Sequence, residues 1–342
     1  MNIAAGKVFM TATNDLALLM VFMVIGVILL QVVKPLQKLF LPAGLIGGTV
    51  ALILGPQVLG IVQLPKTWGG MPTPMINIVL TCALFGVTIN RTKMKNYLGA
   101  INLIVLTYFA QMFVGCLVGI GLGTIWKDLP YSWGLMTVYT YWGGHGAATT
   151  AGTVYESLGV QNMISLGIIM ATFGLIIAMV AGIPLVNYGV RKGWATNMSK
   201  EEMNVGAPTI LLPAEKRKPL GFASVTSESI NGLALQLGFI LLSMFIGGAL
   251  FKSLAKVPIP AFASVMKMIP ALLHGIIGAI ILWAFMRKTG TDKYADMASV
   301  NTISGVALDI CVCSATATLN LKLFASFLAP LLIHMVCIIV LM

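Results

Sequence analysis

Residues 141–152, "YWGGHGAATTAG", place four glycines and the first of the chain's three histidines among twelve residues. Glycine is a poor helix former, because it lacks a Cβ atom and adopts backbone conformations that other residues rarely reach. The other long segments of the chain are strongly apolar. The sequence therefore predicts an interruption of helical backbone inside an apolar environment, and this interruption decides how the rest of the chain is interpreted.

The composition assigns the chain to a class. Of its 342 residues, 58% are hydrophobic and only 9% are charged. A single soluble core cannot bury so much apolar surface, so the surplus must face lipid. The net charge of +11 does not indicate a nucleic-acid partner, because Lys and Arg lie in short connections between apolar segments. We expect an all-α polytopic membrane protein that binds no nucleic acid.

The five cysteines lie within apolar segments. This placement argues against a disulfide framework or a zinc site and favours small apolar packing residues. We therefore expect no resident metal or cofactor.

Apolar runs of about 20 residues predict membrane helices in two sets. The first set covers 15–33, 41–62, 73–90, 99–126 and 163–187, and the second covers 231–254, 260–286, 299–320 and 325–342. A polar segment of mixed charge lies between the sets and is typical of a linker. We expect a first membrane repeat at 1–187, a cytoplasmic linker at 188–229 and a second repeat at 230–342.

The two sets follow a similar plan. In each set the second helix opens on a Pro dipeptide, and the third helix ends in a similar way, with "GVTINRTK" at 86–93 and "TATLNLKL" at 316–323. The alignment of these ends pairs Thr88 with Thr318 and Asn90 with Asn320. The similarity is short, and the common order of helices is what supports a repeat.

The distribution of basic residues predicts the topology. If the N-terminus lies outside and 131–158 does not cross the membrane, fourteen of the 21 Lys and Arg residues lie on the cytoplasmic side and seven lie outside. This asymmetry follows the positive-inside rule. If 131–158 crossed, the basic residues of the linker would move to the side opposite the basic residues of the first loops. We expect an outside N-terminus and a cytoplasmic linker.

The length of segment 131–158 supports the same topology. Its arms, 131–142 and 147–158, have twelve residues each, and about 18 Å of helix does not span a core of about 30 Å. Non-helical backbone is tolerated at that depth only where protein or a water-filled cavity satisfies it. We expect a re-entrant hairpin with its tip at 143–146, within an inverted repeat of about five helices. A glycine-kinked helix packed on a neighbour is the alternative.

These features together resemble the sodium:glutamate symporter family. The features are the "GGHG" tip with small residues after it, the helix "ATFGLIIAMVAGIPLV" at 171–186, the Pro-opened second helix and the basic linker. The resemblance covers nearly the whole chain. It implies a homodimeric secondary transporter of the cytoplasmic (inner) membrane, with two inverted repeats, an elevator-like movement, sodium as the coupling ion and glutamate as the substrate. A di- or tricarboxylate:cation symporter is the runner-up.

The chain departs from the family pattern in two places. Residues 147–150 read Ala-Ala-Thr-Thr where we expect small residues leading to a tryptophan. The sequence given ends at Met342, where a second hairpin and a last helix are expected, so we expect an incomplete second repeat. A non-transporting remnant of a carrier is therefore a second alternative. An intramembrane enzyme is disfavoured, because no nucleophile with a base accompanies the glycine run.

The chemistry of the tip predicts a substrate site. Free carbonyls at the end of the first arm favour a cation, and free N–H groups at the start of the second arm favour a carboxylate. The candidate substrate-binding residues are Gly143, Gly144, His145, Gly146, Ala147, Thr149 and Thr150. His145 could bind substrate, relay a proton or bond a neighbouring helix. For His274 and His334 we expect helix packing or an interfacial position.

A second group of residues predicts an ion site. Asp309 is the only carboxylate near the middle of an apolar span, where a charge is costly and usually functional, unless the residue faces an aqueous cavity. The side-chain oxygens of Thr88, Asn90, Thr318 and Asn320 suit a hard cation such as sodium. Hydrogen bonding between helices is the alternative role for these four residues.

Overall fold

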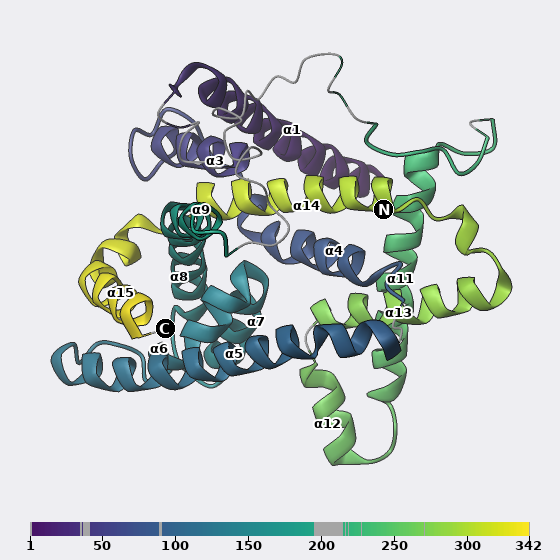
Figure 1. Ribbon diagram of the computed structural model, residues 1–342. Coiled ribbons are helices and arrows are strands. Elements are labelled where there is room, and N and C mark those ends of the chain that lie inside the picture. Colours follow the sequence, from purple (N-terminus) through teal and green to yellow (C-terminus); the bar gives the residue numbers. More distant parts are fainter. Residues whose placement is uncertain are drawn as a thin grey trace. The chain divides into compact units, whose positions relative to one another are not determined.

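The computed structural model describes residues 2–34, 36, 42–88, 91–194, 215, 217, 219–226, 228–269 and 271–341. Every regular element in these residues is a helix (Figure 1). Five of the described helices are long and apolar enough to span a membrane: Gly6–Val32, Leu98–Ile125, Gly232–Leu254, Met297–Ala317 and Phe324–Leu341. The predicted all-α class is confirmed, and these helices fit a membrane protein.

Two helices of the first predicted set are shorter than the sequence indicated. Helix α3 (Ala43–Leu54) ends before 62, because Gly55 is extended, with ψ of 176°, and the residue before a proline avoids the helical region. Helix α4 (Pro72–Leu84) ends before 90, because Gly86 takes a left-handed φ of +84°. The predicted ends at 62 and 90 are therefore wrong.

The predicted helix 260–286 is two helices, α12 (Pro260–Met268) and α13 (Ala271–Thr289). Ile269 is extended, with ψ of 123°, and Pro270 follows it in the sequence, so the helical region is again disfavoured before a proline. Lys267 belongs to α12 and is next to this break.

The predicted helix 163–187 continues to Arg191 with an irregular middle. Helix α8 (Met163–Ile177) passes through a π-helical turn, η3 (Ala178–Gly182), into α9 (Ile183–Arg191). Pro184 opens α9 and has no backbone N–H to donate, so the regular hydrogen-bond ladder is interrupted at this point.

The described residues form two compact units, and each is described by itself. The first unit comprises Met1–Pro72, Tyr97–Pro213 and Val312–Met342, and the second comprises Thr73–Asn96 and Ala214–Cys311. Helix α14 (Met297–Ala317) contributes residues to both units. The sequential repeats at 1–187 and 230–342 remain a prediction.

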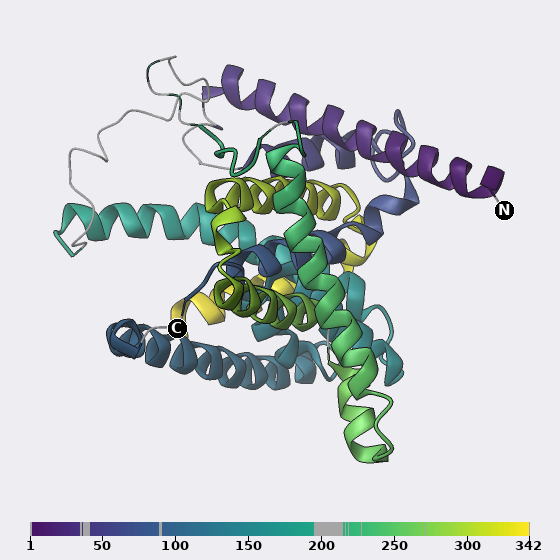
Figure 2. The ribbon, with the colours of Figure 1, turned by 90° about the vertical axis from the view of Figure 1, so that its right-hand side faces the viewer.

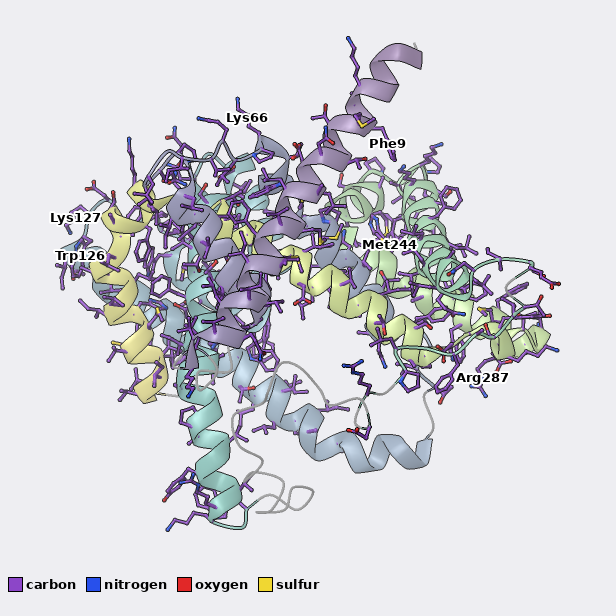
Figure 3. All side chains as sticks on the ribbon, turned by 90° about the horizontal axis from the view of Figure 1, so that it is seen from above. Phe9, Lys66, Trp126, Lys127, Met244 and Arg287 are labelled. Atoms are coloured by element: carbon purple, nitrogen blue, oxygen red, sulfur yellow. The ribbon has the colours of Figure 1, made fainter. Side chains whose placement is uncertain are left out.

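In the first unit, helix α1 (Asn2–Val32) packs along α3 (Figures 1 and 2). The contact is close because Gly47 of α3 faces the backbone of Phe22, with no side chain between them. Beyond α3, the short 3₁₀ helix η1 (Lys66–Gly70) carries the buried Trp68, whose indole N–H donates to the Asp15 carbonyl at 2.9 Å. Residues 6–14 of α1 are exposed, including Phe9 (Figure 3).

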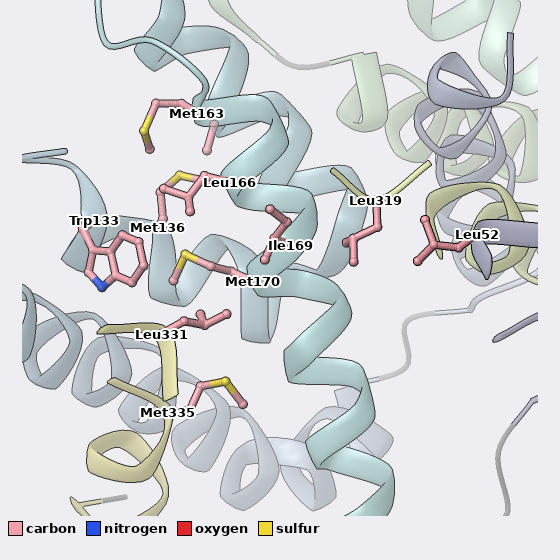
Figure 4. Close-up of a cluster of buried hydrophobic side chains, with 11 residues drawn as sticks. Leu52, Trp133, Met136, Met163, Leu166, Ile169, Met170, Leu319, Leu331 and Met335 are labelled. Atoms are coloured by element: carbon pink, nitrogen blue, oxygen red, sulfur yellow. The ribbon is translucent and has the colours of Figure 1, made fainter. Parts of the chain in front are cut away.

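The core of the first unit surrounds α8. Side chains of α6 (Trp133–Thr137), α8 and α15 (Leu321–Leu341) form its centre (Figure 4). The members labelled there are Leu52, Trp133, Met136, Met163, Leu166, Ile169, Met170, Leu319, Leu331 and Met335. Helix α5 (Arg91–Ile125) also belongs to this unit from Tyr97 onward, and Leu98–Ile125 is largely exposed, as a lipid-facing helix would be.

In the second unit, helix α11 (Gly232–Leu254) packs closely against α13 (Figure 2). Gly247 faces the His274 carbonyl, and Gly278 faces the Ser243 carbonyl, so small residues let the two backbones approach. The His274 ring stacks on Phe251 with centroids 4.5 Å apart, which agrees with the predicted packing role.

The second unit also fixes the start of α14. The buried Gln236 side chain donates to the Tyr294 carbonyl, in the 3₁₀ helix η5 (Asp292–Tyr294), at 2.9 Å and accepts from the Asp296 N–H at 3.1 Å. The Asp296 carboxylate accepts from the Ser299 hydroxyl and the Phe222 N–H. Partial desolvation opposes ionisation, but these hydrogen bonds outweigh it and lower the pKa of Asp296. Its stabilising effect is therefore present above the unfolded pKa and is lost as pH falls through the folded value.

Candidate functional site

Segment 131–158 turns back on itself in the first unit. Its first arm is α6 followed by a π-helical turn, η2 (Val138–Trp142), and its second arm is α7 (Gly144–Ser157). The rings of Tyr131, before the first arm, and Tyr155, near the end of the second, lie in edge contact with centroids 6.5 Å apart. The two ends of the segment therefore lie together, and the arms run antiparallel.

The break between the arms is shorter than the predicted tip of 143–146. Gly143 alone separates η2 from α7, and Gly144 has a left-handed φ of +62°. His145, Gly146 and Ala147 belong to the first turn of α7, because one glycine with positive φ reverses the chain without further residues. The side chains of His145, Thr149 and Thr150 lie outside what the structure describes.

Glycine is favoured at position 144 because of the left-handed backbone conformation, and not because a neighbouring atom leaves no room for a side chain. No heavy atom lies within 4 Å of the position that a Cβ atom would occupy. An L-residue with a side chain pays roughly 1–2 kcal/mol for the left-handed region. A substitution of Gly144 therefore changes the preference of the backbone and introduces no clash.

The break brings two helix ends of opposite polarity together. The first arm ends in a π turn, closed by the Gly143 N–H donating to the Val138 carbonyl at 3.2 Å. The last carbonyls of a helix and the first N–H groups of the next lack partners within their own helix. They carry partial negative and positive charge, respectively. A cation and a carboxylate can therefore bind side by side at this break.

The first arm is held by His334 of α15, whose side chain is 0% exposed. The Trp133 indole N–H donates to His334 Nδ1 at 3.1 Å, and Thr137 Oγ1 lies 2.7 Å from His334 Nε2. The Tyr141 ring centroid is 6.5 Å from the imidazole centroid. The predicted packing role of His334 agrees with these contacts, but its bond to the hairpin was not predicted.

The second arm is held by close backbone approach. Ala148 of α7 faces Gly167 of α8, and Gly152 of α7 faces Ile164 of α8. Glu156, near the end of the arm, accepts from the Ile164 N–H at 3.0 Å and so satisfies one of the free donors at the start of α8.

A pocket of about 230 Å³ lies beside the end of the first arm, lined by residues of α5, η2, α8, η3 and α15. Two buried polar atoms on its lining residues, Gln111 Oε1 and the Tyr141 hydroxyl, have no hydrogen-bond partner within the part of the chain that the structure describes. Buried polar atoms are usually paired with protein or water. The pocket has room for several water molecules that can pair them.

The predicted ion-site residues are distributed over both units. Thr88 is exposed, in the chain that follows α4 in the second unit, and Asn90 lies outside the described residues. Asp309 is half-buried in α14, and its carboxylate makes no side-chain hydrogen bond or ion pair with another described residue. Thr318 and Asn320 lie between α14 and α15 in the first unit. The common ion site therefore remains a prediction.

Gln57 is a residue that sequence reasoning missed. Its side-chain amide donates to the Leu319 carbonyl at 2.7 Å and accepts from the Leu321 N–H at 2.9 Å. Both bonds flank Asn320, so Gln57 fixes the connection that carries two candidate ion ligands. The "GPQ" sequence at 55–57 signals the end of α3, but no local pattern indicates a partner 262 residues away.

The sequence model of one protein family, described as sodium/glutamate symporter, matches residues 8–342. The chain belongs to the sodium/glutamate symporter family. The predicted resemblance is thereby confirmed over nearly the whole chain. No curated protein and no solved structure matches it. Membership in this symporter family supports a membrane transporter of a glutamate-type substrate, in place of an enzyme, and implies sodium as the coupling ion.

Proposed function

We propose that the chain acts as a sodium-coupled symporter of glutamate or a related small acidic amino acid, with 131–158 as a re-entrant hairpin at the substrate site. The observation that carries the proposal is the break at Gly143 and Gly144, where two antiparallel arms meet with opposite polarity in a chain of this family. Both arms are too short to cross a core of about 30 Å.

The substrate carboxylate binds at the first turn of α7 in this proposal. The N–H groups of Gly144, His145 and Gly146 have no partner within the helix and point toward the break, and the positive end of the helix favours an anion. Glycine permits close approach of the substrate to the backbone. The hydroxyls of Thr149 and Thr150 and the imidazole of His145 supply further hydrogen bonds.

Sodium binds at the carbonyl end of the first arm, next to the carboxylate. Two opposite charges a few ångströms apart attract more strongly in a site of low dielectric than in water. Bound sodium therefore raises the affinity for glutamate, and glutamate raises the affinity for sodium by the same factor. This reciprocal effect is the physical basis of the proposed coupling.

Cation-binding roles are also proposed for the predicted ion ligands, namely Asp309 and the residues that follow the predicted third helices. Asp309 supplies a charge, and neutral oxygens come from Thr88, Asn90, Thr318 and Asn320. The bonds from Gln57 to the backbone on either side of Asn320 support an ordered site there.

The proposal includes the predicted topology and assembly. The N-terminus lies on the outer side of the cytoplasmic membrane, and the linker 188–229 lies on its cytoplasmic side. The segments 1–187 and 230–342 are inverted repeats, and the chain forms a homodimer. The asymmetry of Lys and Arg supports this orientation.

The test is uptake by the purified chain in proteoliposomes. Labelled glutamate is expected to accumulate only with an inward sodium gradient, and excess unlabelled glutamate or aspartate is expected to compete. Stronger competition by citrate or malate would assign the carrier to the di- or tricarboxylate alternative. Absence of both uptake and sodium-dependent glutamate binding would contradict the proposal and support a non-transporting remnant.

A further inference from the structure

His334 contacts one face of the first arm along most of its length. Trp133, Thr137 and Tyr141 are spaced four residues apart, so they project from the same side of the helical arm. All three contact the same imidazole, which is 0% exposed. One side chain of α15 therefore sets the position of the arm that ends at the candidate site.

The hydrogen bonds fix the form of the imidazole. An indole N–H can only donate, so His334 Nδ1, 3.1 Å from Trp133 Nε1, must present its lone pair. A neutral imidazole without a proton on Nδ1 carries it on Nε2. That N–H then donates to Thr137 Oγ1 at 2.7 Å. Only this neutral form satisfies both contacts.

A proton on Nδ1 is incompatible with this arrangement. It would place the Nδ1–H against the Trp133 N–H, two donors with no acceptor between them. The elements around His334, namely α5, α6, η2, α8 and α15, contain no Asp or Glu that could offset the charge. A buried cation without a partner is strongly disfavoured.

The other ionisable groups near His334 also give no counter-charge. The Tyr141 ring contacts the imidazole, and Tyr139 packs against the same hydrophobic core. The remaining ionisable groups of α15 and of the described part of α5 in this unit are neutral or basic: Lys322, Cys337, Tyr108 and Cys116. Glu156 of α7 is exposed and bonded to the Ile164 N–H.

We propose that His334 positions the first arm only as a neutral imidazole, so that protonation of His334 and docking of the arm on α15 exclude each other. The proton binds to the Nδ1 lone pair and displaces the Trp133 hydrogen bond, and no other covalent bond is made or broken. By linkage, acid releases the arm, and displacement of the arm raises the proton affinity of His334. The consequence for glutamate binding rests on the proposed function. The contact of neutral His334 with the first arm, called the latch below, does not rest on it.

The first test is nitrogen NMR of the full chain in lipid nanodiscs with ¹⁵N-labelled histidine. The chain has only three histidines, and His334→Gln identifies the signals of this one. At neutral pH we expect the Nε2–H form with an unprotonated Nδ1 nitrogen. An Nδ1–H form or an imidazolium at neutral pH would overturn the proposal.

The second test follows the same signals during acidification of the original chain and of Trp133→Phe. Loss of the donor is expected to raise the proton affinity of His334 roughly threefold to tenfold, as for one hydrogen bond. Trp142→Phe is the control, because Trp142 lies on the same arm but is 43% exposed. If the His334 signals respond to acid in the same way in the original chain and in Trp133→Phe, or titrate in neither, the Trp133 hydrogen bond does not oppose protonation and the proposal is contradicted.

A third test connects the latch to the proposed function. His334→Gln keeps an acceptor for Trp133 and a donor for Thr137 but takes up no proton in this range. We expect glutamate binding to weaken in acid in the original chain and to weaken less in His334→Gln. Equal weakening in both proteins would overturn the effect on the site. If neither protein binds glutamate, the proposed function fails, while the two NMR tests still decide the latch.

Discussion

The two arms of segment 131–158 are held in different ways. The first arm is attached to α15 by hydrogen bonds to one buried side chain, His334. The second arm contacts α8 through small residues, with Gly152 against the backbone of Ile164, and through one exposed hydrogen bond from the Ile164 N–H to Glu156. Hydrogen bonds select one register and are either made or broken, whereas contacts between small residues depend on shape alone. The difference indicates that the first arm sets the position of the tip and the second sets how closely the hairpin packs.

The largest expected effect comes from filling the contact of the second arm. In Gly152→Val, the added Cβ would lie 2.6 Å from the Ile164 Cα and 2.7 Å from its nitrogen, and backbone cannot move aside as a side chain can. We expect about 3 kcal/mol of destabilisation or more, seen as a lower thermal midpoint or loss of folded protein. Gly121→Val on α5, with no heavy atom within 4 Å of its Cβ position, is the matched control. Equal midpoints for the two variants would contradict the close contact.

The next largest effect is expected at the first arm. His334→Leu leaves the Trp133 N–H and the Thr137 hydroxyl buried without their partner, at about 1–3 kcal/mol for each group. His334→Gln is expected to recover part of this loss, because an amide both accepts and donates. Thermal unfolding in nanodiscs compares the two variants. If the His334→Leu variant is as stable as the His334→Gln variant, the first arm does not depend on these hydrogen bonds.

A smaller effect is expected from Gln57→Leu, which removes two hydrogen bonds from the connection before α15. The cost is about 1–2 kcal/mol, because the freed backbone groups are partly reached by water. Since α15 carries His334, the first arm is expected to loosen more than the second. Hydrogen exchange of the Leu321 amide and of α6 measures this, with Gln161→Leu as an exposed control. An unchanged exchange rate of the Leu321 amide would contradict the role of the two Gln57 hydrogen bonds in holding this connection.

The smallest effect is expected from Tyr141→Phe. The hydroxyl has no partner among the described residues, so its removal is expected to leave the free energy of unfolding unchanged or to raise it by up to about 1 kcal/mol. Chemical denaturation with Tyr139→Phe as a control provides the comparison. A clear loss of stability would instead show that a bound water or ligand in the pocket pairs with the Tyr141 hydroxyl.

The sequence predicted the features that depend on composition and on local pattern. The apolar runs gave the membrane class, and the glycines at 143–146 indicated where the backbone is interrupted. The helix ends were less predictable, because hydropathy continues past Gly55 and Gly86 while the backbone does not. Only Gly144 of the predicted tip has a left-handed conformation, and no pattern distinguishes it from its neighbours.

The contacts that hold the hairpin could not be predicted. His334 lies 201 residues from Trp133 in the chain, and as a single histidine in an apolar helix it resembles an ordinary packing residue. Its role depends on which side chains α6 presents to α15, and this follows from tertiary packing. The same reasoning applies to Gln57, whose partners are backbone groups and leave no trace in the sequence.

The most direct test of the central claim, that the tip of the hairpin binds glutamate, compares Gly144→Ala with Gly159→Ala. Both glycines have positive φ and open space at the Cβ position, so both substitutions impose similar backbone strain, but only Gly144 lies at the break. Calorimetric titration of the nanodisc-embedded chain with glutamate in sodium buffer is expected to show weaker binding only for Gly144→Ala. Equal affinities for the two variants, or binding that does not require sodium, would contradict the account.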